Sequence, residues 1–228
     1  MREVCATYRA APKRLKEEGI HTVCVDEKTG IQALEPNAPT KPMRPGQVER
    51  REFEYTRHGT QTLIGNFEVA SGEVVAATVQ KTRGESDFAK HIEQTIGTDP
   101  KAGWIFVADN LTTHGSATLV LLVAGLCAIP VDTLGKKGKS GVLKSVATRK
   151  AFLSMASHRV RFVYVPKHTS WLNQIEIWFS VLSRRVIRRG VFRSTEDLRD
   201  GILKFIDYYN DTMAKPYKWT YAGRPLNV

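Results

Sequence analysis

A continuous apolar run at residues 104–108 (WIFVA) constrains the fold more than any other part of the sequence. Both faces of a strand built from it would be apolar, which predicts a strand buried between two layers of helices. Residues 21–25 (HTVCV) form a second, shorter β-type run that polar residues 26–30 bring to an end. Strand and helix signals then alternate along the chain. This order predicts an α/β domain with a mixed central sheet and helices on both faces.

Turn and cap signals divide the rest of the chain. Residues 62–69 and 73–79 flank Ala70-Ser71-Gly72 and predict a β-hairpin, whereas the four prolines of residues 35–47 predict an irregular excursion. Residues 1–20 read as a basic amphipathic helix or a linker that ends at Gly19. Thr169 or Ser170 is expected to cap a helix that carries Glu176. Further helices are expected at 86–96, 115–129, 146–156 and 194–210, a strand at 161–165, and a mobile basic loop at 135–141.

Positive charge is concentrated in one part of the chain. The 228 residues carry a formal net charge of +11. Between residues 131 and 193 there are 14 lysines and arginines but only two acids, Asp132 and Glu176, so this block holds the whole excess. Such a surface suits a polyanion, and nucleic acid is the leading candidate partner. A solvated basic helix face is the alternative explanation for any one of these residues.

Several classes of protein are disfavoured by composition. No apolar run approaches the roughly 18 residues that indicate a membrane span, and the first residues lack the apolar centre of a signal peptide. We therefore expect a cytoplasmic protein with no membrane partner. The cysteines Cys5, Cys24 and Cys127 are far apart and form no metal-binding or disulfide pattern. They are expected to be small buried apolar residues.

Acidic residues stand where the two apolar strands end. Asp26 follows VCV, and Asp109 follows WIFVA. If these strands are parallel neighbours, both carboxylates appear at the same edge of the sheet. Two carboxylates close together in a partly buried place are costly unless a cation neutralises them, so the pair suggests a hard divalent metal ion.

Glu176 is the candidate for a third ligand. On a helical wheel, Trp171, Ile175, Trp178 and Leu182 form an apolar stripe, and Glu176 lies at its border. A carboxylate there can reach over the edge of the sheet without entering the core. Three such acids could hold two Mg²⁺ or Mn²⁺ ions about 3.5–4 Å apart, the arrangement used in phosphodiester chemistry. The large aromatic residues Trp171, Trp178 and Phe179 are expected to lie in the core.

Each acid also has a purely structural explanation. An aspartate at a strand end is often a turn former, and a glutamate on a helix is often only solvated. The occurrence of all three acids together with the basic block favours the metal site.

Four segments carry a resemblance to a known family: VDEKTGIQALE, RHGTQTLIGNFEVASGEVV, VADNLTTH, and the long block that begins TSWLNQIEIWFSVLSRR. They resemble the catalytic domain of bacterial insertion-sequence DDE transposases related to the mariner elements, over roughly residues 20–221. The resemblance implies a ribonuclease H-like fold, magnesium-dependent cleavage and joining of DNA, and a catalytic and metal-binding triad of Asp26, Asp109 and Glu176. It divides the chain into a lead-in at 1–20, a catalytic domain at 21–213 and a tail at 214–228.

The family motifs also extend the set of candidate residues. Asn110, His114 and Asn173 occupy motif positions and are expected either to orient the acids and the phosphate or to hydrogen-bond local backbone. A homodimer on DNA is the assembly that the resemblance implies. The candidate DNA-binding residues are Lys136, Lys137, Lys139, Lys167, Arg184, Arg185, Arg188 and Arg189.

The sequence departs from the family pattern in two ways. Asp109 and Glu176 are 67 positions apart, more than is usual, and the excess is expected around residues 125–150. The helix-turn-helix DNA-binding region expected before the catalytic domain is also missing. Two alternatives therefore stand beside a transposase: a structure-selective nuclease of the same fold, which cuts but does not join DNA, and an inactive DNA-binding remnant.

Overall fold

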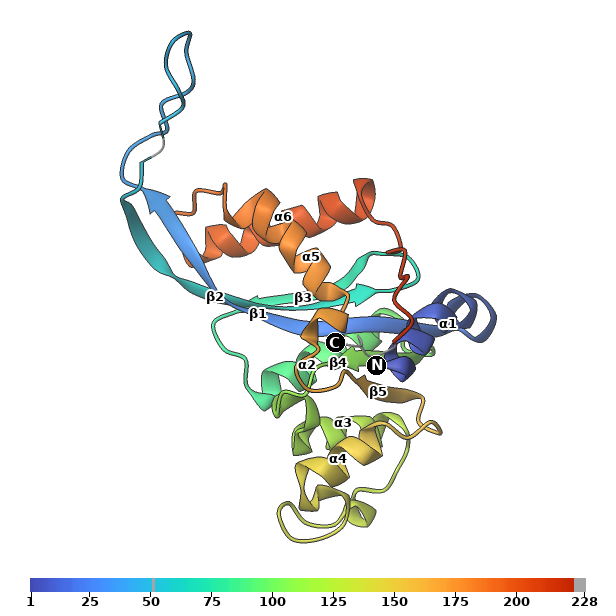
Figure 1. Ribbon diagram of the computed structural model, residues 1–228. Helices are drawn as coiled ribbons and strands as arrows, with labels where there is room; N and C mark the ends of the chain where they lie inside the picture. The colour runs from blue at the N-terminus through green and yellow to red at the C-terminus, as the bar shows by residue number, and fades with distance from the viewer. Residues whose placement is uncertain (51, 224–228) are drawn as a thin grey trace.

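The computed structural model describes residues 1–50 and 52–223 and is built around a five-stranded mixed sheet in the order β3-β2-β1-β4-β5 (Figure 1). The strands are β1 (Ile20–Pro36), β2 (Tyr55–Glu68), β3 (Val74–Gln80), β4 (Gly103–Ala108) and β5 (Val160–Tyr164). β1, β2 and β3 pair antiparallel, whereas β4 lies parallel to β1 and β5 parallel to β4. This order and these directions define a ribonuclease H-like fold and confirm the predicted fold class.

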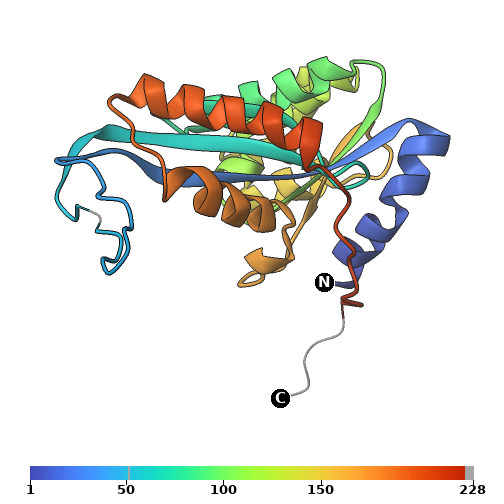
Figure 2. The same cartoon turned by 90° about the horizontal axis from the view of Figure 1, so that it is seen from above.

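Helices cover both faces of the sheet, and each face has its own apolar core. The helices are α1 (Arg2–Glu18), α2 (Glu85–Thr98), α3 (Ala117–Leu126), α4 (Val146–Leu153), α5 (Ile175–Leu182) and α6 (Thr195–Thr212). Residues of α1, α5 and α6 pack on one face, and those of α2, α3 and α4 pack on the other (Figures 1 and 2). Successive residues of β1 alternate between the two cores, because Val23 and Val25 face one and Cys24 faces the other.

The segments that flank the sheet in sequence pack against the same core. Of the two readings of residues 1–20, the helix is the one observed: α1 buries Val4, Cys5 and Tyr8 and ends at Gly19, whose φ of 62° closes the helix in the left-handed region. Residues 214–223 of the predicted tail run back beside α1, where Trp219 meets Tyr8 with ring centroids 5.3 Å apart. Residues 224–228 of that tail lie outside the described residues.

Strand β1 is longer than the sequence predicted. Residues 26–30 were expected to end it in a turn, but it continues to Pro36 and pairs with β2 from Val23 to Pro36. The pairing shifts register between Lys28 and Ile31, where Gly30 takes a φ of 66°. A bulge of this kind accommodates turn-forming residues inside a strand, so the pairing with β2 overrides the local turn signal. The excursion expected at 35–47 starts later, and residues 37–50 and 52–54 form an arm that projects from the body (Figure 1).

The helix that carries Glu176 begins later than expected. Thr169 and Ser170 do not cap it, because Ser170–Leu172 forms a separate 3₁₀ turn, η4, and Asn173 then adopts an extended conformation. α5 begins only at Ile175, and Gln174 precedes it without a side-chain cap. Trp171 therefore lies outside the helical stripe and is 49% exposed, which contradicts the prediction that it is a core residue. Trp178 and Phe179 are buried as predicted.

The other elements agree with the sequence to within a few residues. The helix expected at 194–210 is α6, and Ser194 caps it by accepting a hydrogen bond from the backbone nitrogen of Asp197 at 3.0 Å. The loop expected at residues 135–141 is a hydrogen-bonded turn, in which the Lys136 nitrogen donates to the Ser140 carbonyl at 3.2 Å. Within the part of the chain that the structure describes, no helix combines the length and apolar character needed to cross a membrane.

Candidate active site

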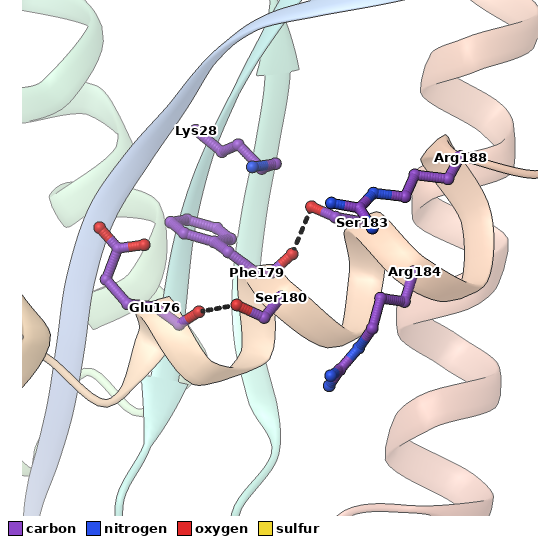
Figure 3. Close-up of a pocket in the computed structure, with 7 residues that line it drawn as sticks. All are labelled: Lys28, Glu176, Phe179, Ser180, Ser183, Arg184 and Arg188. Atoms are coloured by element: carbon purple, nitrogen blue, oxygen red, sulfur yellow. Dashed lines mark hydrogen bonds between the residues drawn. The ribbon is translucent and has the colours of Figure 1, made fainter.

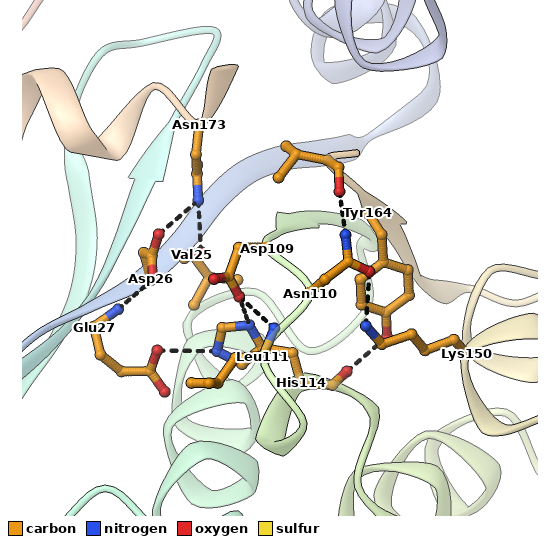
Figure 4. A network of polar contacts seen from close by, with 11 residues as sticks. Val25, Asp26, Glu27, Asp109, Asn110, Leu111, His114, Lys150, Tyr164 and Asn173 are labelled. Carbon is orange, nitrogen blue, oxygen red and sulfur yellow. Dashed lines mark hydrogen bonds and ion pairs between the residues drawn. The ribbon is translucent and has the colours of Figure 1, made fainter. Parts of the chain in front are cut away.

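Two aspartates meet where β1 and β4 end. These strands are parallel neighbours, as predicted, and their last paired residues are Cys24 and Val107. Asp26 and Asp109 each lie two residues further along, at the same edge of the sheet (Figure 4). A continuation of the pairing by two residues would place them side by side. The fold therefore brings together two acids that are far apart in the sequence.

Asp26 is held in a nearly closed position. It is 7% exposed, and its Oδ1 accepts a hydrogen bond from the Glu27 backbone nitrogen at 2.8 Å. Asn173 donates from Nδ2 to Asp26 Oδ2 at 3.3 Å and to the Val25 carbonyl at 3.0 Å. Burial, and next to it the charge of Asp109, raise the pKa of Asp26 to about 7. The ionised form of Asp26 is therefore disfavoured unless a cation lies beside it.

The side chain of Asp109 contacts residues of the segment that follows β4. Its Oδ1 accepts a hydrogen bond from the Leu111 backbone nitrogen at 2.8 Å and lies 2.7 Å from His114 Nδ1 (Figure 4). Burial works to raise the pKa of Asp109, but the contacts with His114 and Leu111 outweigh it and lower the pKa. Asp109 is thus kept ionised by a neighbouring histidine.

His114 connects Asp109 to a fourth acid, Glu27, which the sequence analysis did not single out. His114 Nε2 lies 3.0 Å from Glu27 Oε2, and the side chains of His114 and Glu27 are 0% and 2% exposed. Burial works against protonation of His114, yet Asp109 and Glu27 raise its pKa to about 9. A hydrogen bond from the Tyr164 hydroxyl to the His114 carbonyl at 2.6 Å fixes the backbone of this turn. The result is a chain that runs from buried Glu27 through buried, charged His114 to the partly exposed Asp109.

Glu27 could have been found from the strand period. It follows Asp26 directly, so it points to the opposite face of the sheet, where a charged side chain has to find a partner among helices. The partner could not be predicted. His114 belongs to the short 3₁₀ turn η1 (Thr113–Gly115), and no periodic pattern of apolar residues indicates which way its side chains point.

Glu176 lies in the first turn of α5 on an exposed face. Burial raises its pKa, the charge of Lys28 lowers it, and the charge of Asp109 raises it. Asp109 therefore acts on both Asp26 and Glu176, and the three predicted acids share one electrostatic environment. Within residues 1–50 and 52–223, however, no three acidic, histidine or cysteine side chains already form a group that could hold a metal ion. Asp109 Oδ1 is engaged by His114 and Leu111 instead.

Asn110 and Lys150 brace the end of β4. Asn110 donates from Nδ2 to the Val165 carbonyl, just after β5, and accepts from Lys150 Nζ at 2.8 Å. The Lys150 ammonium also lies 4.5 Å from the ring centroid of Tyr164. Asn110 thus bonds backbone that is distant in the sequence, next to the end of β5, whereas Asn173 bonds both the backbone of Val25 and an acid. Lys150 belongs to the basic block, but nothing in the sequence distinguished it from its neighbours.

The chemistry of these donors fits a divalent metal ion. Asp26, Asp109 and Glu176 offer only carboxylate oxygens, the ligands that Mg²⁺ and Mn²⁺ prefer. Burial is the largest cause of the raised pKa of Asp26 and the charge of Asp109 is the next, and a bound cation would oppose both by favouring the ionised carboxylate. These three residues are the ones that would hold the metal.

The predicted DNA-binding residues fall into four places. Lys167 lines a hollow next to Asp109 and Asn110, and Arg184 and Arg188 line a hollow next to Glu176 (Figure 3). Arg185 and Arg189 line a neighbouring hollow with Val181 and Met213. Lys136, Lys137 and Lys139 lie in the turn before α4, and flanking residues Leu134 and Leu143 pack in the core opposite α5. Lys137 pairs with Glu85 at 3.7 Å.

The chain belongs to the DDE superfamily endonuclease family, whose sequence model matches residues 21–199. This match confirms the family predicted from the motifs and spans Asp26, Asp109 and Glu176. A comparison with curated proteins found no match.

Solved structures of the Mos1 mariner transposase are similar to this chain at low identity. A Mos1 paired-end complex with the left transposon end has 18% identity and a TM-score of 0.34, over 91% of this chain and 59% of that one. The catalytic domain of Mos1 has 11% identity and a TM-score of 0.30, over 91% of this chain and 89% of that one. This chain thus spans about three fifths of the longer Mos1 chain.

Proposed function

We propose that the chain is the catalytic domain of a DNA transposase that hydrolyses phosphodiester bonds at the ends of a transposable element and joins the liberated 3′-hydroxyl to target DNA. Asp26, Asp109 and Glu176 are its catalytic acids. Membership of the DDE endonuclease family supports cleavage of DNA. The concentration of positive charge next to the acids supports DNA as the partner. By the family resemblance, the active form is a homodimer on DNA.

The observation that carries this proposal is the meeting of Asp26 and Asp109 at the ends of two parallel strands, with Glu176 inside the field of Asp109. At neutral pH and above, an aspartate whose pKa is raised to about 7 lowers the folding stability when it ionises. Such a cost is typical of a site selected for chemistry rather than for stability.

The protein's own residues keep the acids ready for this role. Asn173 fixes Asp26 from the α5 side, and charged His114 keeps Asp109 ionised from the other side. Bound to these acids, two divalent cations would activate the attacking hydroxyl and stabilise the leaving oxygen. Lys28, Arg184 and Arg188 line the hollow next to Glu176, and these cations would bind the DNA backbone.

Substitution of each acid tests the proposal. Asp26→Asn, Asp109→Asn and Glu176→Gln should each reduce Mg²⁺- or Mn²⁺-dependent cleavage of DNA carrying the element's ends by about a thousandfold or more. The matched control is Asp132→Asn, which removes an exposed aspartate from the same basic block. Circular dichroism and thermal unfolding check that each variant folds. Full activity in one of the three variants would remove that acid from the site.

A nuclease that cuts without joining is the second candidate, and the family match to endonucleases favours it as far as cleavage goes. A pre-cut substrate with a free 3′-hydroxyl end separates the two functions. The transposase should join this end to a target plasmid in the presence of Mg²⁺ or Mn²⁺. Cleavage of an intact end without any joining of the pre-cut end would favour the nuclease.

A further inference from the structure

A hollow runs beside α5, next to Glu176 and away from the two aspartates, and we call it the α5 groove (Figure 3). Its volume is about 430 Å³. The groove is lined by Lys28, Glu176, Phe179, Ser180, Ser183, Arg184 and Arg188. Three of these residues are cations and one is an acid, so the groove has a positive balance.

The helical period explains why these residues line one surface. Glu176, Ser180 and Arg184 follow each other at intervals of four residues and lie on one face of the helix. After α5 the backbone widens into a π-helical turn, Ser183–Ile187, in which the Arg188 nitrogen donates to the Ser183 carbonyl at 2.9 Å. Turns of this kind are frequent at functional sites. The wider turn carries Arg188 to the groove as well.

Lys28 faces the groove from the sheet. It lies two residues after Asp26 on β1, so both side chains point toward α5. Its ammonium lies 5.9 Å from the centroid of the Phe179 ring, and Phe179 is itself buried. A cation over an aromatic face is held in place by the ring's electrostatic field. Lys28 is therefore presented to the groove in a defined position.

Some exposed cations of the chain are paired with carboxylates, whereas the groove cations are not, within the part of the chain that the structure describes. Lys13 pairs with Glu17, Lys137 pairs with Glu85, and Arg193 pairs with Glu35, at 3.7, 3.7 and 3.3 Å. Among the described residues, Lys28, Arg184 and Arg188 form no salt bridge with a carboxylate. Lys28 and Arg188 also line an adjoining hollow along β1 with Gly30 and Gln32, so these two cations stand where the hollows meet.

We propose that the α5 groove is a subsite for one backbone phosphate of the DNA strand that enters the acid site, with Lys28 and Arg188 as its paired cationic contacts. This inference rests on the proposed function, because the strand is the one whose phosphodiester reacts. An anion fits a groove with three cations and one acid, and an open groove that continues along β1 fits a chain better than a small molecule. Arg185 and Arg189, which face the neighbouring hollow, contact a different part of the DNA.

Binding of a short fluorescently labelled DNA duplex, measured by anisotropy over a range of salt concentrations, tests the subsite. Lys28→Gln should weaken binding about threefold to tenfold, and the Lys28→Gln/Arg188→Gln pair should lower the slope of log Kd against log salt by about 0.9. The control Lys101→Gln removes an exposed lysine near the opposite end of β4 and should leave binding within about twofold. Lys28→Arg, which keeps the charge, should restore binding.

A pair of double-mutant cycles shows whether Lys28 and Arg188 share a phosphate. The Lys28→Gln/Arg188→Gln variant should differ from the product of the single effects by about threefold or more, because its residues act on one group. For the Lys28→Gln/Arg189→Gln variant, the loss of affinity should equal the product of the losses in the two single variants. Two outcomes would overturn the subsite and indicate diffuse charge only. One is an equal loss of DNA affinity in Lys28→Gln and Lys101→Gln. The other is a Lys28→Gln/Arg188→Gln variant whose loss of affinity equals the product of the single losses.

The outcomes keep the subsite and the proposed function apart. If the binding pattern is as expected but no DNA is cut in Mg²⁺ or Mn²⁺, the proposed function fails and the phosphate subsite stands. If DNA is cut but Lys28→Gln binds like Lys101→Gln, the subsite fails and the function stands. A chain that binds no DNA at low salt overturns both. Thermal unfolding of each variant confirms that a loss of binding is not a loss of fold, and Lys28→Met, which keeps the side-chain stem over Phe179, replaces Lys28→Gln if that variant unfolds.

Discussion

Two histidines at opposite ends of the β1–β4 pair each contact two carboxylates. At the start of β1, His21 Nδ1 lies 2.8 Å from Glu68 Oε2, and His21 Nε2 lies 3.5 Å from Asp99 Oδ2. Beyond the end of β4, His114 lies 3.0 Å from Glu27 and 2.7 Å from Asp109. The same residue types thus form a similar cluster twice in one sheet.

The two clusters differ in how well their charges are compensated. Glu68 also accepts hydrogen bonds from the backbone nitrogens of Thr22 and Ala70 at 3.2 and 3.4 Å, and Asp99 is half exposed to solvent. At the other end, Glu27 Oε1 is buried without a partner among the described residues, and Asp26 lies in the field of Asp109. The His21 cluster is therefore a structural link between strands. In the His114 cluster, the negative charges of the acids are only partly compensated, which favours a bound cation.

The largest contrast between the clusters should come from Asp26→Asn and Glu68→Gln. Because the folded-state pKa of Asp26 is raised from 3.8 to about 7, its stability contribution is lost as pH rises through that range. Asp26→Asn should therefore stabilise the metal-free protein at pH 8, by up to about 4 kcal/mol at about 1.36 kcal/mol for each pKa unit, while cleavage falls about a thousandfold. Glu68→Gln should destabilise the protein by about 1–3 kcal/mol and leave cleavage unchanged.

Urea unfolding in EDTA and a gel assay of cleavage in Mg²⁺ measure the two effects. Opposite signs of the stability change are the feature that separates the clusters. A loss of stability in Asp26→Asn as large as that in Glu68→Gln would mean that both acids are structural.

The pH dependence of stability should separate the two histidines. The folded-state pKa of His114 is raised from 6.5 to about 9, so its contribution is fully present below pH 6.5 and is lost as pH rises through 9. The free energy of unfolding of the metal-free protein should fall by about 3 kcal/mol over that window. In His114→Asn this part of the slope should vanish. The measurement is urea unfolding at a series of pH values.

His21→Asn is the matched control for the pH series. Its hydrogen bond with Glu68 raises the pKa of His21 against the effect of burial, but His21 is partly exposed and its link to Asp99 is solvated. The slope that this variant removes should be smaller and confined to pH values just above 6.5. Equal slopes in the two variants would show that burial does not distinguish the clusters.

The sequence was sufficient to predict that Asp26 and Asp109 lie at one edge of the sheet. It was not sufficient to predict the contacts of Glu27 and His114 beside them. Asp26 and Asp109 were predictable because each ends an apolar run that has to be a buried strand, and parallel neighbours end at one edge. Glu27 and His114 were not predictable as a pair. Their contact depends on the path of a 3₁₀ turn after β4, which is set by packing against Phe88 and Tyr164 rather than by a local pattern.

The errors of the sequence analysis have a common physical cause. The helical wheel placed Trp171 in the stripe of α5 because it assumed one unbroken helix, whereas Asn173 interrupts it to bond Asp26 and the Val25 carbonyl. The turn expected after Asp26 was replaced by strand pairing with β2. In both places a long-range contact at the candidate site overrides a local signal.

Glu27→Gln should have an effect on cleavage that is smaller than that of Asp26→Asn, and it tests the difference between the two histidine clusters. The amide can still contact His114, but the substitution removes one of the two carboxylate charges that raise the pKa of His114. Cleavage should fall about 10- to 100-fold, and the Mg²⁺ concentration needed for half-maximal cleavage should rise. The matched variant at the other cluster, Asp99→Asn, should change neither quantity. A Glu27→Gln variant with wild-type cleavage and metal dependence would confine Glu27 to a structural role.

The smallest effect is expected from cations that brace the two ends of β4. Lys150 donates to Asn110 at 2.8 Å beside the acids, and Arg159 donates to the Ala102 and Pro100 carbonyls at 2.6 and 3.0 Å at the opposite end. Each bond stabilises the fold by about 1 kcal/mol. Arg159→Met loses two bonds, and Lys150→Met loses one bond together with its contact to the Tyr164 ring, so both variants should lower thermal stability. Only Lys150→Met should also slow cleavage, by about fivefold for a lost bond of about 1 kcal/mol, because Asn110 follows Asp109 directly and moves with it. Equal cleavage rates in the two variants would show that the end of β4 is rigid without Lys150, and that Asn110 takes its position from the Val165 carbonyl alone.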